Sequence, residues 1–140
     1  MPRCLNSCLE QDLPANEYEI IAINDGSSDN SLQILNAYAL KYPNIRVINQ
    51  ENRGLGATRN KGLNLAIGEY IWFVDSDDTI EENCLGSLVK TAGEKKLDVL
   101  CFGLNLVYSD NHTDIFTIPH EASGKVYDGK QFICRVNMPG

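Results

Sequence analysis

The sequence predicts an α/β protein with a mostly parallel sheet and flanking helices. Two apolar stretches, at residues 18–24 and 69–74, are continuous rather than alternating, which is typical of strands covered on both faces. Segments of helical length follow them, after turns rich in Asp, Gly, Ser and Asn. Alternation of strands with helices of this length favours parallel strands joined by right-handed crossovers.

The elements are expected in a simple order. The chain opens inside a helix, at about residues 2–11. Strands are predicted at 18–24, 45–49, 69–74 and 97–108, and helices at 31–42, 57–67 and 80–96. Trp72, within the third strand, is expected in the core. Beyond Tyr108 the pattern weakens to a short strand or hairpin around 115–118.

Composition limits the classes of partner. The 140 residues, 43% of them hydrophobic, suffice for one domain with a real core. The net charge of -7, with no basic cluster beyond Lys95 and Lys96, argues against a nucleic-acid partner. No apolar run approaches the roughly 18 to 20 residues of a membrane span, and the N-terminus lacks a signal-peptide pattern. We therefore expect a cytoplasmic protein, with docking at a membrane surface and homo-oligomer formation left open.

The cysteines do not predict a disulfide scaffold or a zinc site. Their number is odd, and the chain has no CxxC and no paired histidine to complete a zinc set. Cys4 and Cys8 fall on one face of the first helix, where they would be either small core residues or a redox pair; we favour reduced core thiols. His112 and His120 are expected at the surface. The cysteines are Cys4, Cys8, Cys84, Cys101 and Cys134.

Acidic motifs follow two of the predicted strands. Asp25 lies in NDGSSDNS after the first strand, and Asp75, Asp77 and Asp78 lie in VDSDD after the third. Because ligands of open α/β sheets bind outside the carboxyl ends of the strands, both motifs are expected at the same edge. Alone, NDGSSDNS would be interpreted as a helix-capping turn. The two motifs together predict a ligand site.

The second motif suggests a divalent cation. On an extended chain Asp75 and Asp77 would point the same way, with Cβ atoms roughly 6.5 to 7 Å apart, a span that one cation and its waters can bridge. Carboxylate oxygens suit Mg²⁺ or Mn²⁺, and such an ion would relieve the mutual repulsion of the carboxylates. The alternative is a solvated acidic turn ahead of a helix that starts near Ile80.

Three motifs in this order, NDGSSDNS, NRGLGATRNKGLNLAIGEYI and FVDSDD, resemble the core of the family 2 glycosyltransferases with the GT-A fold. The resemblance covers about residues 5–105. It implies a Rossmann-like architecture that binds a nucleotide-diphosphate sugar, usually a UDP-sugar, with a divalent metal. It also implies metal-dependent transfer, with inversion, to a saccharide or lipid-linked acceptor.

The resemblance also implies roles for individual residues. Asp25 matches the aspartate that hydrogen-bonds the nucleotide base, with Gly26 and Ser27 shaping its turn. Arg59 and Asn60 match the loop-helix segment on the nucleotide side. Asp75 matches the first aspartate of the DxD motif, which faces the ribose and the metal waters. Asp77 matches the direct metal ligand, and Asp78 is an auxiliary candidate.

The chain departs from the family pattern at both ends. The family's first strand is absent, because the chain opens inside the helix that follows it, and no residue matches the acceptor-activating carboxylate. We therefore expect residues 1–107 to form the nucleotide-sugar-binding core without its first strand, residues 108–140 to begin an incomplete acceptor-side region, and the catalytic base to lie outside this chain. The acidic residues after position 108 look like loop residues and receive no role: Asp110, Asp114, Glu121 and Asp128.

Two other functions are weighed against this one. DSDDT also resembles the DxDxT loop of haloacid dehalogenase-type phosphatases, but Asp78 stands where that loop carries Gly, and two βα units come first. A non-catalytic nucleotide-sugar-binding fragment is the other alternative. A dinucleotide-binding loop is excluded because Arg59 occupies the third glycine's place in GLGATR. The expected context is polysaccharide or glycolipid assembly at the inner face of the membrane.

Overall fold

The computed structural model describes residues 1–108, 112–120 and 123–127. It divides into two compact units, Met1–Val89 and Lys90–Gly140, which are described separately. Cys134, and three of the acidic residues left without a role, Asp110, Glu121 and Asp128, lie outside the described residues. None of the helices in the described ranges is long and apolar enough to span a membrane.

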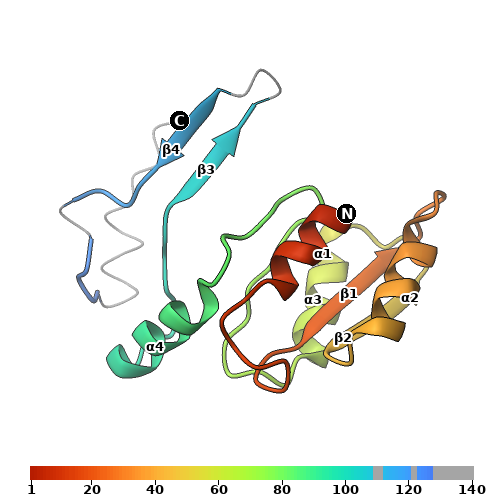
Figure 1. Ribbon diagram of the computed structural model, residues 1–140, viewed down its shortest axis with the longest axis horizontal. Helices are drawn as coiled ribbons and strands as arrows, with labels where there is room; N and C mark the ends of the chain where they lie inside the picture. The colour runs from red at the N-terminus through yellow and green to blue at the C-terminus, as the bar shows by residue number, and fades with distance from the viewer. Residues whose placement is uncertain (109–111, 121–122, 128–140) are drawn as a thin grey trace. The chain divides into compact units, whose positions relative to one another are not determined.

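The first unit is built on a parallel βαβ arrangement (Figure 1). Strands β1 (Ile20–Asp25) and β2 (Ile45–Gln50) pair in parallel, with Ile20 opposite Ile45 and Asp25 opposite Gln50. The connection between them is α2 (Ser31–Lys41). Helices α1 (Pro2–Leu9) and α3 (Leu55–Leu65) complete the unit, and the predicted α/β class with a parallel sheet and flanking helices is confirmed.

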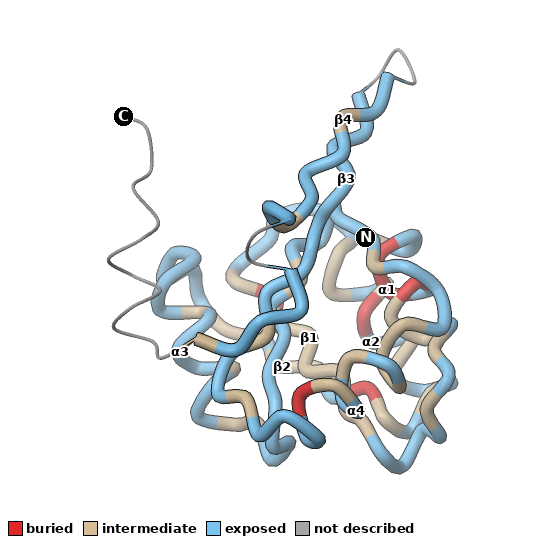
Figure 2. Tube along the Cα trace, turned by 90° about the vertical axis from the view of Figure 1, so that its left-hand side faces the viewer, coloured by how far each residue is buried: buried red, intermediate tan, exposed pale blue. Residues whose placement is uncertain are grey.

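The helices cover both faces of this two-stranded sheet. Tyr38 of α2 donates a hydrogen bond to Asn6 Oδ1 of α1 at 2.8 Å, so these two helices lie side by side. On α3, a Cβ at Gly62 would lie 3.5 Å from Ile23 Cδ1. Because strand side chains alternate, Ile23 and Asp25 point to the same face, which is therefore the face that α3 covers. Figure 2 shows that few of the described residues are buried; the apolar ones are Cys4, Leu5, Leu35 and Ile45 in the first unit and Ala92 in the second.

The predicted strand at 69–74 is wrong. No described residue pairs with this segment in a ladder, so it forms no strand. Trp72 is 38% exposed rather than in the core, and Phe73 is 47% exposed. The physical reason is that a strand needs a hydrogen-bonded neighbour. The two strands of this sheet, β1 and β2, pair with each other and not with residues 69–74.

The helix predicted from residue 80 starts later, as α4 (Leu85–Lys95). Residues before it are held by the end of α1 instead. Ile80 N donates to Ser7 Oγ at 3.1 Å, and the backbone N–H groups of Cys84 and Leu85 both donate to Gln11 Oε1 at 3.1 Å. Gln11 therefore satisfies backbone donors at the start of α4 that would otherwise lack partners.

In the second unit, the long strand predicted at 97–108 is shortened to β3 (Leu104–Val107). It pairs antiparallel with β4 (Thr113–Phe116), so the four residues of β4 set its length. The short strand expected around 115–118 thus exists but begins earlier. His112, expected at the surface, is exposed and lies 2.8 Å from Asp114 Oδ1.

Candidate functional site

The Asp25 turn (residues 24–30) ends β1 in a set of hydrogen bonds to the segment that follows β2. Asp25 Oδ1 accepts from Gln50 Nε2 at 2.7 Å and from the Arg53 N–H at 2.9 Å, while Oδ2 accepts from the Gly54 N–H at 2.9 Å. The Gln50 amide, then the backbone donors, hold the pKa of Asp25 below its ordinary value of 3.8. The carboxylate is therefore ionised at neutral pH.

Gly26 is required by the shape of this turn. Its φ is +73°, a conformation that side chains disfavour, and a Cβ built on it would lie 2.7 Å from the backbone N of Asn52. The Asp25 turn therefore approaches the backbone after β2 too closely for any other residue. Further along the turn, Asp29 Oδ1 accepts from the Ser31 N–H at 2.9 Å, so an aspartate supports the start of α2 as the sequence predicts.

The start of α3 connects this turn to the second acidic motif. Gly54 precedes α3, so Asp25 places its negative charge at the N-terminus of that helix, where it is favourable. Thr58, in the first turn of α3, accepts a hydrogen bond from Gln50 Nε2 at 3.2 Å. The next residue, Arg59, reaches the second motif: its Nη2 lies 2.9 Å from Asp75 Oδ1 and 3.2 Å from Oδ2.

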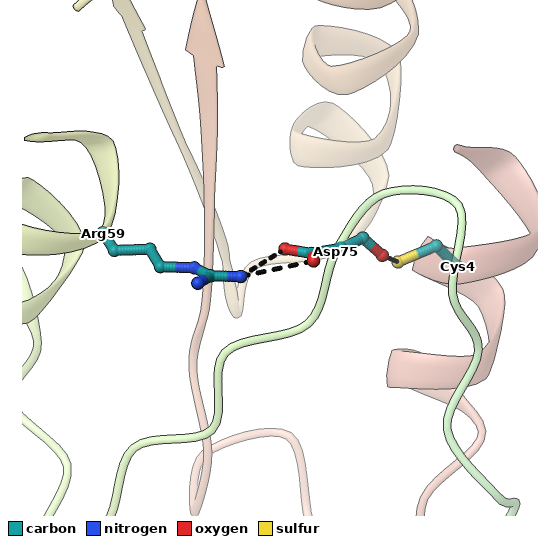
Figure 3. Close-up of polar contacts among 3 residues, drawn as sticks. All are labelled: Cys4, Arg59 and Asp75. Atoms are coloured by element: carbon teal, nitrogen blue, oxygen red, sulfur yellow. Dashed lines mark hydrogen bonds and ion pairs between the residues drawn. The ribbon is translucent and has the colours of Figure 1, made fainter. Parts of the chain in front are cut away.

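Asp75 is held from two directions, as Figure 3 shows. Arg59 of α3 approaches its carboxylate, and Cys4 of α1 donates through Sγ to its backbone oxygen at 3.5 Å. Cys4 and Cys8 are both free thiols, and Cys4 is buried, as the reduced interpretation predicts. The hydrogen bond between the two thiols lowers the pKa of Cys4 to about 7 and raises that of Cys8.

The DSDD turn (residues 75–78) is not extended. The Asp78 N–H donates to Asp75 O at 3.0 Å, which closes a turn, so the expectation that Asp75 and Asp77 point the same way along an extended chain is wrong. The reason is local: the chain turns directly after the apolar segment, before any strand forms. Asp77 and Asp78 are exposed.

The carboxylates of the DSDD turn could contribute to a divalent-cation site but do not form a complete one. Within the described residues, no three His, Cys, Asp or Glu side chains are assembled as a metal site. Asp75 is already paired with Arg59. What remains are the exposed, hard carboxylates of Asp77 and Asp78. The Asp77 carboxylate suits an ion that takes most of its other ligands from water and a bound phosphate, as Mg²⁺ commonly does.

The predicted residues are thus only partly brought together. Asp25, Arg59 and Asp75 form one chain of contacts through the first turn of α3. Ser27 and Asn60 are exposed, and no hydrogen bond among the described residues ties them to this chain of contacts.

Sequence reasoning missed Gln50, Thr58 and Cys4. Gln50 could have been found by aligning the two parallel strands, because it is the register partner of Asp25. Thr58 could have been found as the neighbour of Arg59 in the predicted helix. Nothing in the local sequence signals the contact of Cys4 with Asp75.

Comparison with known proteins identifies the family. The sequence matches Glycosyl transferase family 2 over residues 1–137. It is 46% identical over 98 residues to a putative glycosyltransferase, EpsH, from Bacillus subtilis, covering 70% of this chain and 28% of that protein. It is 44% identical over 98 residues to a poly(ribitol-phosphate) beta-glucosyltransferase from Bacillus spizizenii, covering 69% of this chain and 16% of that protein.

A solved structure gives the same result for the fold. S. aureus TarS, crystallised in complex with UDP, superimposes with a TM-score of 0.62 at 38% sequence identity, covering 66% of this chain and 28% of TarS. The same protein has been crystallised with UDP-GlcNAc. The chain spans less than a third of the length of these relatives. The chain belongs to glycosyl transferase family 2 and has its GT-A type fold.

Proposed function

We propose that the protein to which this chain belongs transfers a sugar from a nucleotide-diphosphate donor, with UDP as the nucleotide, to a saccharide or lipid-linked acceptor. The transfer depends on Mn²⁺ or Mg²⁺ and proceeds with inversion. The acceptor-activating base is supplied by a residue outside this chain. The reaction takes place in the cytoplasm, at the inner face of the membrane.

One observation carries the proposal. The first turn of α3 joins the two acidic turns into a single polar surface. Thr58 is linked to Asp25 through Gln50, which donates to both, and Arg59 contacts Asp75 directly. A site that binds a nucleotide diphosphate needs both an acceptor for the base and a cation for the phosphates, and this surface presents both. TarS, which shares the fold and 38% of the aligned residues, binds UDP in its crystal structure.

The residues divide the work by their charge and contacts. Asp25, ionised and held by backbone donors, accepts from an N–H of the base. Arg59 balances Asp75 in the ligand-free protein and offsets diphosphate charge when the donor binds, because its side chain is 42% exposed and can reach a second anion. Asp75 faces the ribose, and Asp77 would hold the divalent cation. That ion would stabilise the charge that develops on the departing diphosphate.

The test is a thermal-shift panel on the full-length gene product. UDP, CDP and ADP are added with Mn²⁺ or with EDTA, and the melting temperature is recorded. We expect UDP with Mn²⁺ to give the largest rise, since a ligand at 100 times its Kd stabilises the folded state by about 2.7 kcal/mol. Equal rises in EDTA would contradict the metal-dependent mechanism, and the absence of any nucleotide effect would contradict the donor.

Turnover separates an enzyme from a binding fragment. We expect the protein to release UDP from a bound UDP-sugar, either by transfer to an acceptor or by hydrolysis. If a UDP-sugar binds but no UDP is released with any acceptor tested, the non-catalytic alternative is favoured. The phosphatase alternative loses its support, because the chain belongs to another family and Asp75, which would have to be the nucleophile, is paired with Arg59.

A further inference from the structure

Gln50 occupies a specific position beside the candidate base-binding aspartate. It is the last residue of β2 and the register partner of Asp25 on β1. Its Nε2 donates to Asp25 Oδ1 at 2.7 Å and to Thr58 Oγ1 at 3.2 Å. One amide nitrogen therefore contacts both the aspartate and the first turn of α3.

The orientation of this amide is determined by charge. If the amide were turned over, its oxygen would face the Asp25 carboxylate at the same distance, and two acceptors would repel each other. In the observed orientation Gln50 Oε1 is buried and accepts from no described residue. An unpaired buried oxygen costs free energy, so the contact of Nε2 with Asp25 outweighs that cost.

We infer that Gln50 is a positioning residue for nucleotide binding: it holds the Asp25 carboxylate in the orientation that accepts from the base. The inference rests on the proposed function, since it assumes that Asp25 contacts a nucleotide. Gln50 and the N–H groups of Arg53 and Gly54 fill three acceptor positions of a carboxylate that has about four. These contacts fix the plane of the carboxylate, and with it the directions from which a base N–H can approach its oxygens.

A substitution of nearly the same shape tests this role. Gln50→Glu replaces the donor with a second carboxylate next to Asp25. Two carboxylates in contact share a proton, so the pKa of the pair is raised and the hydrogen bond returns at acid pH. Relative to the wild type at each pH, we expect UDP affinity to be about tenfold or more weaker at pH 8 and to recover to within about threefold at pH 5.5.

The measurement is isothermal titration of UDP with Mg²⁺ on the full-length protein at both pH values. The charged side chains within four residues of Asp25 or Gln50 along the chain are Asp29, Arg46, Glu51 and Arg53. These and Arg59, which follows Thr58, are unchanged in the variant. Gln33→Glu, on an exposed position of α2, adds the same charge elsewhere and should bind UDP like the wild type at both pH values. Gln50→Met, which has no donor at any pH, should lose affinity equally at both.

A double-mutant cycle shows whether Gln50 acts through Asp25. In an Asp25→Ala background there is no carboxylate for Gln50 to orient or for Gln50→Glu to repel, so adding that second change should cost less than about twofold in UDP affinity. A merely structural role would give the same loss in both backgrounds. Melting temperatures measured without nucleotide establish that each variant is folded.

The outcomes distinguish this inference from the proposed function. If Asp25→Asn weakens UDP binding but Gln50→Glu binds like the wild type at pH 8, the positioning role is overturned and the proposed function stands. If Gln50→Glu is weakened equally at pH 8 and pH 5.5, the positioning role is also overturned. If the wild type binds no UDP, both are overturned.

Discussion

The Asp25 turn and the DSDD turn present the same side chain near the same helix, but in opposite environments. Asp25 is partly buried, accepts three hydrogen bonds from Gln50 and the segment after β2, and follows a paired strand. The DSDD turn is exposed, follows a segment without strand pairing, and has an ion pair from Arg59 to Asp75. The Asp25 carboxylate is therefore held in place by the fold before a ligand binds, whereas Asp77 and Asp78 of the second turn are exposed.

The largest expected effect is on catalysis, in the DSDD turn. Asp77→Asn should abolish sugar transfer in the full-length enzyme, because it removes the carboxylate that would hold the cation, a loss of several kcal/mol in the transition state on the usual scale. The melting temperature in EDTA should stay equal or rise, since one of three neighbouring negative charges is gone. Glu69→Gln is the matched control: it also removes one negative charge at an exposed position, and this variant should transfer sugar at the wild-type rate. A variant that melts lower in EDTA and still transfers would show that the DSDD turn is structural.

The next effect is on stability, in the Asp25 turn. Gly26→Ala should lower the free energy of unfolding by about 1–3 kcal/mol or more, because it adds both backbone strain and a Cβ at 2.7 Å from Asn52 N. Gly54→Ala is the matched control: its φ is also positive, at +80°, but a Cβ there meets nothing within 4 Å. Urea unfolding of both variants should show the larger loss for Gly26→Ala. Equal losses would mean that the close approach to Asn52 contributes nothing.

A smaller effect is expected for the ion pair between α3 and the DSDD turn. Arg59→Ala should change the free energy of unfolding by about 1 kcal/mol or less, since the two side chains are 42% and 49% exposed and such pairs contribute little. UDP affinity, by contrast, should fall clearly, and Arg59→Lys should restore only part of it because Lys lacks the planar, two-pronged guanidinium. If Arg59→Ala lost much stability but kept its UDP affinity, the ion pair to the DSDD turn would have a structural role and not a ligand-binding one.

The smallest expected effect is a change in acid sensitivity. The hydrogen bond from Gln50 and the backbone donors lower the pKa of Asp25 in the folded protein below 3.8, so its stabilising contribution is complete above that pH and is lost as the pH falls through the folded value. Melting temperatures of Asp25→Asn should therefore fall less between pH 5 and pH 3 than those of the wild type. If the melting temperatures of the two proteins fell equally between pH 5 and pH 3, the hydrogen bonds to the ionised Asp25 would contribute nothing to stability.

Much of this protein can be predicted from local pattern. Buried strands, helix lengths and turn residues repeat over short distances, so β1, α2, β2 and α3 begin and end within about two residues of their predicted bounds. The motifs around Asp25 and Asp75 indicate the family from the sequence alone. The turn of Asp25 can also be anticipated, because Asp, Gly and Ser favour such turns wherever they occur.

Most of the failures involve partners distant in sequence. Residues 69–74 have the composition of a strand, but a strand exists only where a neighbour offers hydrogen bonds, and composition does not supply one. The late start of α4 depends on Gln11, more than seventy residues earlier in the chain. The contact of Cys4 with Asp75 and the place of Gln50 against Asp25 likewise arise from packing and strand register. Local sequence thus specifies which side chains can do the chemistry, and tertiary packing decides which of them meet. The reason is that each contact joins segments far apart in the chain, and the local sequence of one segment does not determine which other segment packs against it.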